Sequence, residues 1–442
     1  MHDLHDSPPP EAVPTGPFAW YQRTPLYLRI VAALFIGVLA GLKLGHWAVN
    51  LAPFSSVVLR LLGALATPLI FVAVIRALVK AKISGRTGAQ LLTQLFMNTT
   101  VAILIGLLIA NTIQPGTHTH IDASLAHKPS QIPFDPVKDL LGKLPGSVLK
   151  PLAENDVMGV IIIALAIGAG LRKVREQVAH IESEHSVIQL IEAFLDAGFR
   201  LIMVVLHWVL ELIPFAVFCV VASNVGKEGL KTFLPMIWFV GAVLIALALQ
   251  AVYYIIRLRM ATWVKPGEFL KAGAEALWTA FSTASSAATL PITFRCMRDK
   301  LGVREESVSL GVMVGGAFNH DGTALYEAMS ALFISQILGR HLGLGEQLTV
   351  VLMSILASVG AAGIPEAGTV TMLAVFNAVH LPVEYIPMLL VVDWFLDRCR
   401  TAINVMGDMV VTCILDGKVR ATPPPSADHP SIETASVATA AE

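Results

Sequence analysis

The chain has 442 residues, of which 55% are hydrophobic and only 14% are charged. Soluble globular proteins carry about 25% charged residues, so the composition excludes an ordinary soluble protein and indicates a polytopic membrane protein in a lipid bilayer. The formal net charge of −1 gives no sign of a nucleic-acid partner. The four cysteines form no CxxC pair, and we expect them to be buried thiols.

The first part of the chain is dominated by apolar stretches of about spanning length. Before them, residues 1–24 are acidic and rich in proline, unlike a cleavable signal peptide, and we expect a cytoplasmic tail. Residues 419–442 read as a disordered cytoplasmic tail. The predicted spans are 26–48, 55–80, 89–113, 156–171, 197–223 and 232–258.

Beyond residue 260 the apolar pattern is interrupted twice. Residues 276–294 and 353–376 are apolar at both ends but small, polar or broken by proline in the middle. Each arm is too short to cross a bilayer core of about 30 Å, so we expect two re-entrant helical hairpins. A long apolar helix with a polar face follows each one, at 306–336 and 383–415. Paired interrupted segments indicate a transporter site built on inverted repeats.

Basic residues predict the orientation. Lysines and arginines gather after the second, fourth and sixth predicted spans, after the first hairpin and at Lys418 and Arg420. Because positively charged loops stay on the cytoplasmic side, we expect a multi-pass protein of the cell membrane, inner or plasma membrane, with both termini in the cytoplasm.

The last predicted helix carries a stripe of polar residues along one face. A charge at the bilayer centre costs roughly 2.5–3.5 kcal/mol, so these side chains must face a cavity and not lipid. Arg400 could bind a carboxylate with two parallel hydrogen bonds, and Asp397 could hold an ammonium group. The alternative is a structural ion pair between Asp397 and Arg400. The stripe comprises Asp393, Asp397, Arg400, Thr401, Asn404 and Asp408, at spacings that share one helix face.

The helix expected at 306–336 contains "GGAFNHDGTALYEA". Asn319, Thr323 and Glu327 follow one another at four-residue steps, which would align them on one helix face. Asp321, followed by Gly322, does not fit that line, and we expect a local unwinding that exposes carbonyl oxygens to a hard cation such as Na⁺. Glu327 could carry a proton in an apolar helix, or could be a protonated core residue.

Four motifs in this order resemble the dicarboxylate/amino acid:cation symporters, the glutamate transporter family. They are "SSAATLP", "NHDGTALYEA", "ASVGAAGIPEAG" and "DWFLDRCRTAINVMGD", and the resemblance covers residues 25 to 418. It implies an all-α polytopic membrane protein with eight transmembrane helices, two re-entrant helical hairpins, an elevator mechanism and a homotrimer. Residues 25–258 would be mainly scaffold and trimerisation spans, with the third and sixth spans contributing to the transport domain. Residues 259–418 would form the transport core.

The resemblance also implies roles for individual residues. Substrate would be bound by Ser285, Ser286, Thr323, Gly363, Asp397, Arg400, Thr401 and Asn404. Sodium would be coordinated by Asn98, Thr99, Asn319, Asp321, Ser358, Asn404 and Asp408. Glu327 and His320 would take part in proton coupling. No cofactor is expected beyond the coupling ions, Na⁺ and/or H⁺.

The sequence departs from the family pattern around the deeper cation sites. His320 stands where methionine is usual, and Gln94-Leu95 and Asn98-Thr99 replace the usual Tyr-Tyr and Thr-Thr/Ser pairs. Because histidine titrates near neutral pH, these departures suggest partial or full proton coupling. The alternative is a neutral histidine with a structural role.

The function expected is a symporter that imports glutamate or aspartate with Na⁺ and with H⁺ as a second coupling ion. Two alternatives remain open: a C4-dicarboxylate:cation symporter, and a carrier of the same amino acids coupled to protons alone. Because the chain has both Arg400 and Asp397, the expected substrate is an acidic amino acid and not malate. We do not expect an enzyme, because Ser286, His320 and Asp321 lack a GxSxG motif. A channel is a further alternative, since charged faces also line pores.

Overall fold

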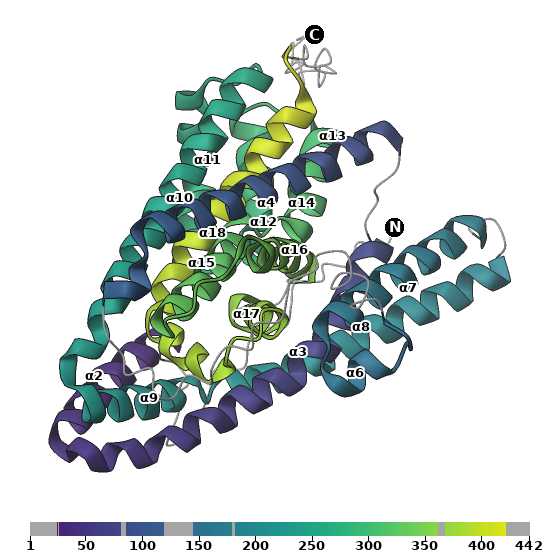
Figure 1. The fold of residues 1–442 in the computed structure, drawn as a ribbon. Coiled ribbons are helices and arrows are strands. Elements are labelled where there is room, and N and C mark those ends of the chain that lie inside the picture. The colour runs from purple at the N-terminus through teal and green to yellow at the C-terminus, as the bar shows by residue number, and fades with distance from the viewer. Residues whose placement is uncertain are drawn as a thin grey trace, which may run out of the picture.

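The computed structural model describes residue 24 and residues 26–80, 85–118, 145–178, 182–360 and 367–420. Every regular element in these ranges is helical, which agrees with the expected all-α fold (Figure 1). The expected N-terminal tail lies almost entirely outside the described residues, as do Gly363 and the C-terminal tail from residue 421 onward.

The first three predicted spans are confirmed as helices. Two of them have 29 residues, enough at 1.5 Å per residue to cross a bilayer core. Short 3₁₀-helices follow the first and third. The elements are α2 (Leu26–Leu44), η1 (Gly45–Leu51), α3 (Ala52–Lys80), α4 (Gly85–Ile113) and η2 (Pro115–His118).

The predicted fifth span, 197–223, is wrong as a single helix. The structure divides it between α8 and α9, and Pro214 lies in the first turn of α9. Proline lacks a backbone N–H and clashes with the carbonyl group four residues earlier, so one helix ends and the next begins. The elements of this region are α6 (Lys150–Glu154), α7 (Val157–Val178), α8 (Glu182–Leu210), α9 (Ile213–Glu228), η4 (Gly229–Phe233) and α10 (Leu234–Ala261).

Both interrupted segments consist of two helices that pack against each other. In the first, α11 (Pro266–Thr283) and α12 (Ser286–Arg295) are joined through Ala284, whose φ of 51° is left-handed. The second pair is α16 (Leu344–Gly360) and α17 (Ala367–Ala378), whose connection lies outside the described residues. With 10 and 12 residues, α12 and α17 are too short to span a bilayer.

The two polar helices differ in continuity. The second is one helix of 31 residues, α18 (Ile386–Asp416), preceded by η7 (Val383–Tyr385). The first is divided, and Asn319 has extended backbone angles of φ −94° and ψ 96°. After α12, the elements up to this point are η5 (Cys296–Lys300, π-helical), α13 (Glu305–Val308), η6 (Ser309–Val314, π-helical), α14 (Gly315–Phe318) and α15 (Asp321–Ile337).

The expected unwinding near Asp321 is confirmed, but it lies at Asn319 and His320 and not at Asp321 itself, which begins α15. The expected alignment of Asn319 with Thr323 on one continuous helix is therefore wrong. A four-residue step aligns side chains only where the helix is unbroken.

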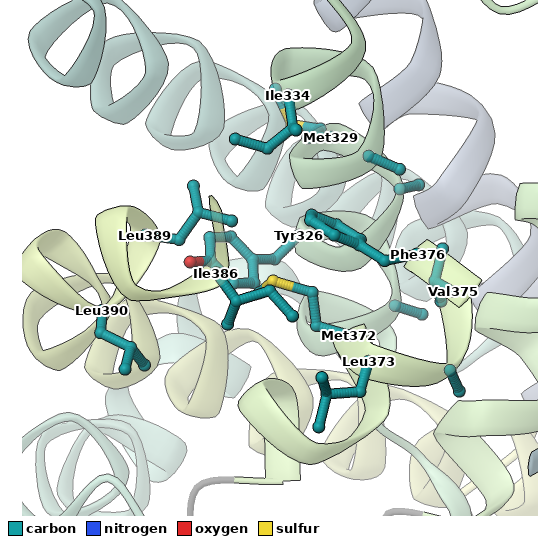
Figure 2. Close-up of a cluster of buried hydrophobic side chains, with 14 of the residues drawn as sticks. Tyr326, Met329, Ile334, Met372, Leu373, Val375, Phe376, Ile386, Leu389 and Leu390 are labelled. Atoms are coloured by element: carbon teal, nitrogen blue, oxygen red, sulfur yellow. The ribbon is translucent and has the colours of Figure 1, made fainter. Parts of the chain in front are cut away.

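The centre of the molecule is α15, which is buried along nearly its whole length and packs against α4, α16, α17 and α18. In Figure 1 the yellow α18 runs alongside α10 and α11. Figure 2 shows part of the apolar core that fixes α15, where Tyr326 meets side chains of α17 and α18, among them Phe376 and Ile386. This core holds the polar residues of α15 and α18 in register.

In the described part of the chain, four helical stretches are long and apolar enough to cross a membrane. Two of them run through more than one α-helix, and all four precede α11. They are Leu28–Val79, Arg86–Thr117, Val187–Lys227 and Pro235–Ala261. Charged side chains inside the helical bundle are surrounded by apolar side chains, so each of them needs an ion-pair or hydrogen-bond partner.

Candidate functional site

Arg400 lies at the centre of the polar face of α18 and is fully buried. Its Nη2 atom is 2.8 Å from Oδ1 of Asp397 and 2.9 Å from Oδ1 of Asp393. The guanidinium also lies over the ring of Tyr326, 4.0 Å from the centroid, in a cation–π contact. The ion pair with Asp397 considered from the sequence is therefore present, but Asp393 shares it.

The Arg400 guanidinium retains unused hydrogen-bonding capacity. Its Nε and Nη1 atoms are buried and have no hydrogen-bond partner. Gly368 of α17 lies beside Nη1, and a Cβ atom at Gly368 would approach Nη1 to 2.9 Å. A buried donor without an acceptor is costly. These two unpaired donors lie on different edges of a charged guanidinium, and both edges share Nη2, so this part of the site is suited to an anionic group.

Residues of α15 and α18 meet directly next to Arg400. The backbone N–H of Gly322 donates to Oδ1 of Asn404 over 2.8 Å, and Nδ2 of Asn404 lies 3.5 Å from the Thr323 hydroxyl. Thr401 is also buried. A Cβ atom at Gly322 would lie 2.7 Å from the carbonyl oxygen of Arg400, so the two helices approach at a distance that glycine permits.

One turn further along α18 lies a second group, built around Asp408. The Asn319 Nδ2 atom donates to Oδ1 of Asp408 (2.9 Å) and to the backbone carbonyl of Asn404 (3.1 Å). Oδ1 of Asn319 is buried without a partner. Within the described ranges no basic side chain pairs with Asp408, which is 1% exposed. A buried carboxylate beside an unpaired amide oxygen fits a hard cation such as Na⁺.

Asp321 forms a third group, between α4, α10 and α15. Oγ1 of Thr99 donates to Oδ1 of Asp321 over 2.6 Å, and the Tyr254 hydroxyl donates to Oδ2. Asn98, next to Thr99, is also buried, but its Oδ1 accepts a hydrogen bond from Arg257 of α10. The structure thus brings Thr99 to Asp321 as expected, and directs Asn98 to an arginine.

The proposed proton-coupling residues lie in the same core. Glu327 is fully buried and accepts a hydrogen bond from the Thr371 hydroxyl of α17. His320 is 8% exposed, its Nδ1 has no partner, and it lies beside the backbone of Ser358, which is itself buried. Glu327 thus lies in the buried core with a hydroxyl donor on its carboxyl group.

The first hairpin reaches α18 through a different residue from those predicted. Ser285 caps α12 by accepting a hydrogen bond from the Ala288 N–H at 3.2 Å, and Ser286 begins the helix. In the described structure neither serine hydrogen-bonds to α18. Arg398 instead donates to the carbonyl oxygens of Phe281 (3.0 Å) and Ser282 at the end of α11. Arg398 thus points away from the polar stripe of α18.

Comparison with known proteins now identifies the family. The profile of the Sodium:dicarboxylate symporter family matches residues 26–418. The chain belongs to this family. It is 31% identical to an excitatory amino acid transporter of Caenorhabditis elegans, over 88% of this chain and 87% of that protein. It is 28% identical to excitatory amino acid transporter 3 of Mus musculus, over 88% of this chain and 85% of that protein.

Membership of the Sodium:dicarboxylate symporter family confirms the resemblance seen in the four motifs. The chain is thus a membrane transporter of the symporter class, and this explains why so many polar residues occupy its buried centre. It does not belong to a family of enzymes.

Sequence reasoning missed two residues of this symporter's polar centre, Tyr254 and Arg257 of α10. Tyr254 is fully buried against Asp321, and Arg257 reaches α4. A signal was present, because the sequence "YYIIRLR" places aromatic and basic residues at the end of an otherwise aliphatic span. The arginines near the end of the sixth predicted span were interpreted only as markers of the cytoplasmic side, although a long side chain such as that of Arg257 can also turn back into the bundle.

Proposed function

We propose that this symporter imports acidic amino acids, glutamate or aspartate, together with Na⁺ and with protons. One observation carries the proposal above all others: Arg400 is fully buried, offers two unpaired donors and lies in contact with Asp397. Such a site has a place for a carboxylate and, one turn away, a place for an ammonium group. The relatives are excitatory amino acid transporters by name, which supports the same substrate class.

In this proposal each polar group of the substrate has a partner. The side-chain carboxylate binds Arg400 with Thr323 nearby, and the amino group binds Asp397 with Thr401 beside it. The α-carboxylate is held by Asn404 and by the hairpin residues Ser285 and Ser286, and Gly363 is a further substrate-binding residue. Substrate binding would then release Nη2 of Arg400 from its shared ion pair with Asp393 and Asp397.

Asp397 argues against the C4-dicarboxylate alternative. The second carboxylate of malate would meet the Asp397 carboxylate at the place where an amino acid presents its ammonium group. Two like charges a few ångströms apart repel by about 4 kcal/mol at an effective dielectric constant near 20. An acidic amino acid therefore fits the charge pattern better.

The cation sites follow from the second and third groups. Asp408, Asn319 and Asn404 provide carboxylate, amide and carbonyl oxygens in one place, the ligand set that hard cations prefer. We propose that Na⁺ binds there, and that Asp321, Thr99 and Ser358 contribute to cation binding nearby. Glu327 carries the proton, and His320 is the second candidate for proton coupling. The alternative coupled to protons alone remains to be separated by experiment.

The proposed mechanism is an elevator within a homotrimer. Residues 259–418, with the third and sixth spans, would form the transport core, and the remaining spans among residues 25–258 would form the scaffold. Eight transmembrane helices and two re-entrant hairpins would result, with both termini in the cytoplasm. The short helices α12 and α17 support the re-entrant assignment, because neither can cross a bilayer alone.

The test is uptake of radiolabelled aspartate, glutamate and malate into proteoliposomes under Na⁺ and proton gradients imposed separately. We expect concentrative uptake of an amino acid that stops when an ionophore collapses the gradient. Accumulation above the external concentration also separates a carrier from a channel, since a pore cannot concentrate its solute. Absence of amino-acid accumulation under both gradients would overturn the proposal.

Asp397→Asn tests the ammonium site within the same assay. The variant should lose aspartate and glutamate uptake while uptake of radiolabelled malate rises, because the repelling charge is gone. Asp299→Asn is the matched control, since Asp299 is exposed and pairs with Arg298 away from the site. If the wild-type protein accumulates malate and neither amino acid, the dicarboxylate alternative is correct.

A further inference from the structure

Arg257 extends from α10 to α4 and binds two amide side chains there. Its Nη1 atom donates to Oδ1 of Asn98, and its Nη2 atom donates to Oε1 of Gln94. Asn98 is fully buried, so Arg257 brings a permanent positive charge to the edge of the buried polar centre. The guanidinium also lies over the ring of Tyr253, 5.6 Å from its centroid.

Arg257 and Asp321 belong to one network. On α4, Asn98 binds Arg257 while the adjacent Thr99 binds Asp321. On α10, Tyr254 binds Asp321 and lies one helical turn before Arg257. Each helix therefore supplies one hydroxyl to the carboxylate, and α4 binds the guanidinium that α10 carries. Arg257 is close enough to act electrostatically on Asp321.

This network does not fit a Na⁺ ion at Asp321. Both Asp321 oxygens already accept hydroxyl hydrogen bonds, and Oδ1 of Asn98 accepts from a cation. The Asn98 Nδ2 atom is buried without a partner, so the unused hydrogen-bonding capacity of this amide is that of a donor, which cannot coordinate Na⁺. A Na⁺ ion here would also be repelled by the guanidinium. Asn319, by contrast, has a buried oxygen free beside Asp408.

We propose that Arg257 is a tethered counter-cation for Asp321 and takes the place of one co-transported Na⁺ at that carboxylate. Coupling sodium then binds only around Asp408. The inference rests on the proposed function for Na⁺ binding at Asp408, and it revises the role of Asp321 and Thr99, which here serve the Arg257 guanidinium and not Na⁺. Arg257 is accordingly a residue that sets the number of coupling ions, and it acts without touching the substrate.

The first test uses Na⁺ alone, with no amino acid present. The full-length protein, purified in detergent, is unfolded by heat in NaCl and in choline chloride at equal ionic strength. A ligand that binds only the folded state raises the unfolding temperature. We expect Arg257→Gln to gain an additional Na⁺-dependent rise of at least about 2 °C over the wild type, because Asp321 becomes free to bind the ion.

Two variants control for charge and for position. Arg257→Lys keeps the positive charge and should respond to Na⁺ as the wild type does. Arg259→Gln removes the same charge two residues away, at an exposed position, and should also match the wild type. Equal Na⁺ responses in all four proteins would overturn the proposal. So would an Arg257→Lys variant that gains the same response as Arg257→Gln, because the charge would then be irrelevant.

Unfolding of Arg257→Gln is also informative. If the variant folds only when NaCl is present, the ion has replaced the guanidinium, which supports the proposal. If it stays unfolded at every NaCl concentration while Arg257→Lys folds, Arg257 is a structural brace and the proposal is wrong. Absence of aspartate or glutamate uptake would overturn the proposed function, but it would leave this Na⁺ result unchanged.

A second readout measures coupling directly. In proteoliposomes with a tenfold Na⁺ gradient and no membrane potential, one additional co-transported Na⁺ contributes about 1.4 kcal/mol. The equilibrium accumulation ratio of the substrate should therefore be about tenfold higher for Arg257→Gln than for Arg259→Gln. Equal ratios would show that the number of coupling ions is independent of Arg257.

Discussion

The side-chain amide of Asn319 donates to the Asp408 carboxylate across 2.9 Å, and this bond ties the break before α15 to the polar face of α18. Asn319 also binds the backbone carbonyl of Asn404, 3.1 Å away. One side chain thus joins the interrupted helix to the continuous one at the place where we propose that Na⁺ binds. Several measurable consequences concern this junction and the residues around it.

Asp408→Asn should weaken the response to Na⁺. The substitution removes the only carboxylate in the group around Asn319, and a neutral amide attracts a hard cation far less. We expect the half-saturating Na⁺ concentration for uptake to rise by about tenfold or more, equivalent to a loss of at least about 1.4 kcal/mol. This concentration is measured by titrating initial uptake rates with Na⁺, and Asp299→Asn is the control because Asp299 is exposed. An unchanged titration would place the ion elsewhere.

Arg400→Lys should weaken binding of the acidic substrate while preserving the local charge balance. A lysine ammonium still neutralises Asp393 and Asp397, but it cannot form two parallel hydrogen bonds. Losing one charged hydrogen bond costs about 1.5–3 kcal/mol, which corresponds to roughly a 10- to 100-fold higher half-saturating aspartate concentration.

Arg304→Lys is the matched control for Arg400→Lys. Arg304 also pairs with an acid of α18, but with Asp416 at the far end of the helix (2.8 Å). The substrate affinity of the Arg304→Lys variant should stay close to that of the wild type. If both lysine variants lose affinity equally, the effect comes from the packing of α18 and not from the binding of a carboxylate.

Gly322→Ala and Gly198→Ala should change stability in opposite directions. A Cβ atom at position 322 would meet the backbone oxygen of Arg400 at 2.7 Å, and backbone cannot move aside as a flexible side chain can. We expect a loss of about 1–3 kcal/mol. Nothing lies within 4 Å of the corresponding atom at Gly198 in α8, so alanine there should stabilise by about 0.4–1 kcal/mol. Thermal unfolding in detergent compares the two, and similar shifts would disprove the close approach of α15 and α18.

Glu327→Gln should remove the proton dependence of transport. Glutamine has nearly the same shape and can still accept the hydrogen bond from Thr371, but it cannot release a proton. Uptake driven by a proton gradient should fall to background, whereas Na⁺-dependent exchange of substrate should persist. Glu346→Gln serves as control, because Glu346 pairs with Arg340 outside this core. Proton-driven uptake that survives in Glu327→Gln would make His320 the residue to examine next.

The features predicted well from the sequence are those that depend on neighbours along the chain. The stripe from Asp393 to Asp408 was predicted because an unbroken helix places residues three and four apart on one face. The interruption at Ala284 was visible as a run of small residues. Pro214, which divides the predicted fifth span, was also visible in the sequence, and its effect was overlooked.

The features that escaped prediction depend on packing between distant segments. Tyr254 and Arg257 meet Asp321 and Asn98 across 67 and 159 positions of the chain, and no local pattern encodes such pairings. The sharing of Arg400 between two aspartates depends likewise on side-chain geometry that helix periodicity leaves open. The alignment of Asn319 with Thr323 was wrong because the periodic rule was applied across a break in the helix.

The π-helical turn η6, just before α14, has a consequence for length variation in this region. A π-helical turn accommodates one more residue than an α-helical turn. Deleting one residue from Ser309–Val314 can therefore be absorbed by a return to α-helical geometry, and Asn319 and Asp321 keep their directions. The same deletion inside α15 would turn every later side chain by about 100°. Single-codon deletions in this gene should accordingly be tolerated at η6 and eliminated within α15.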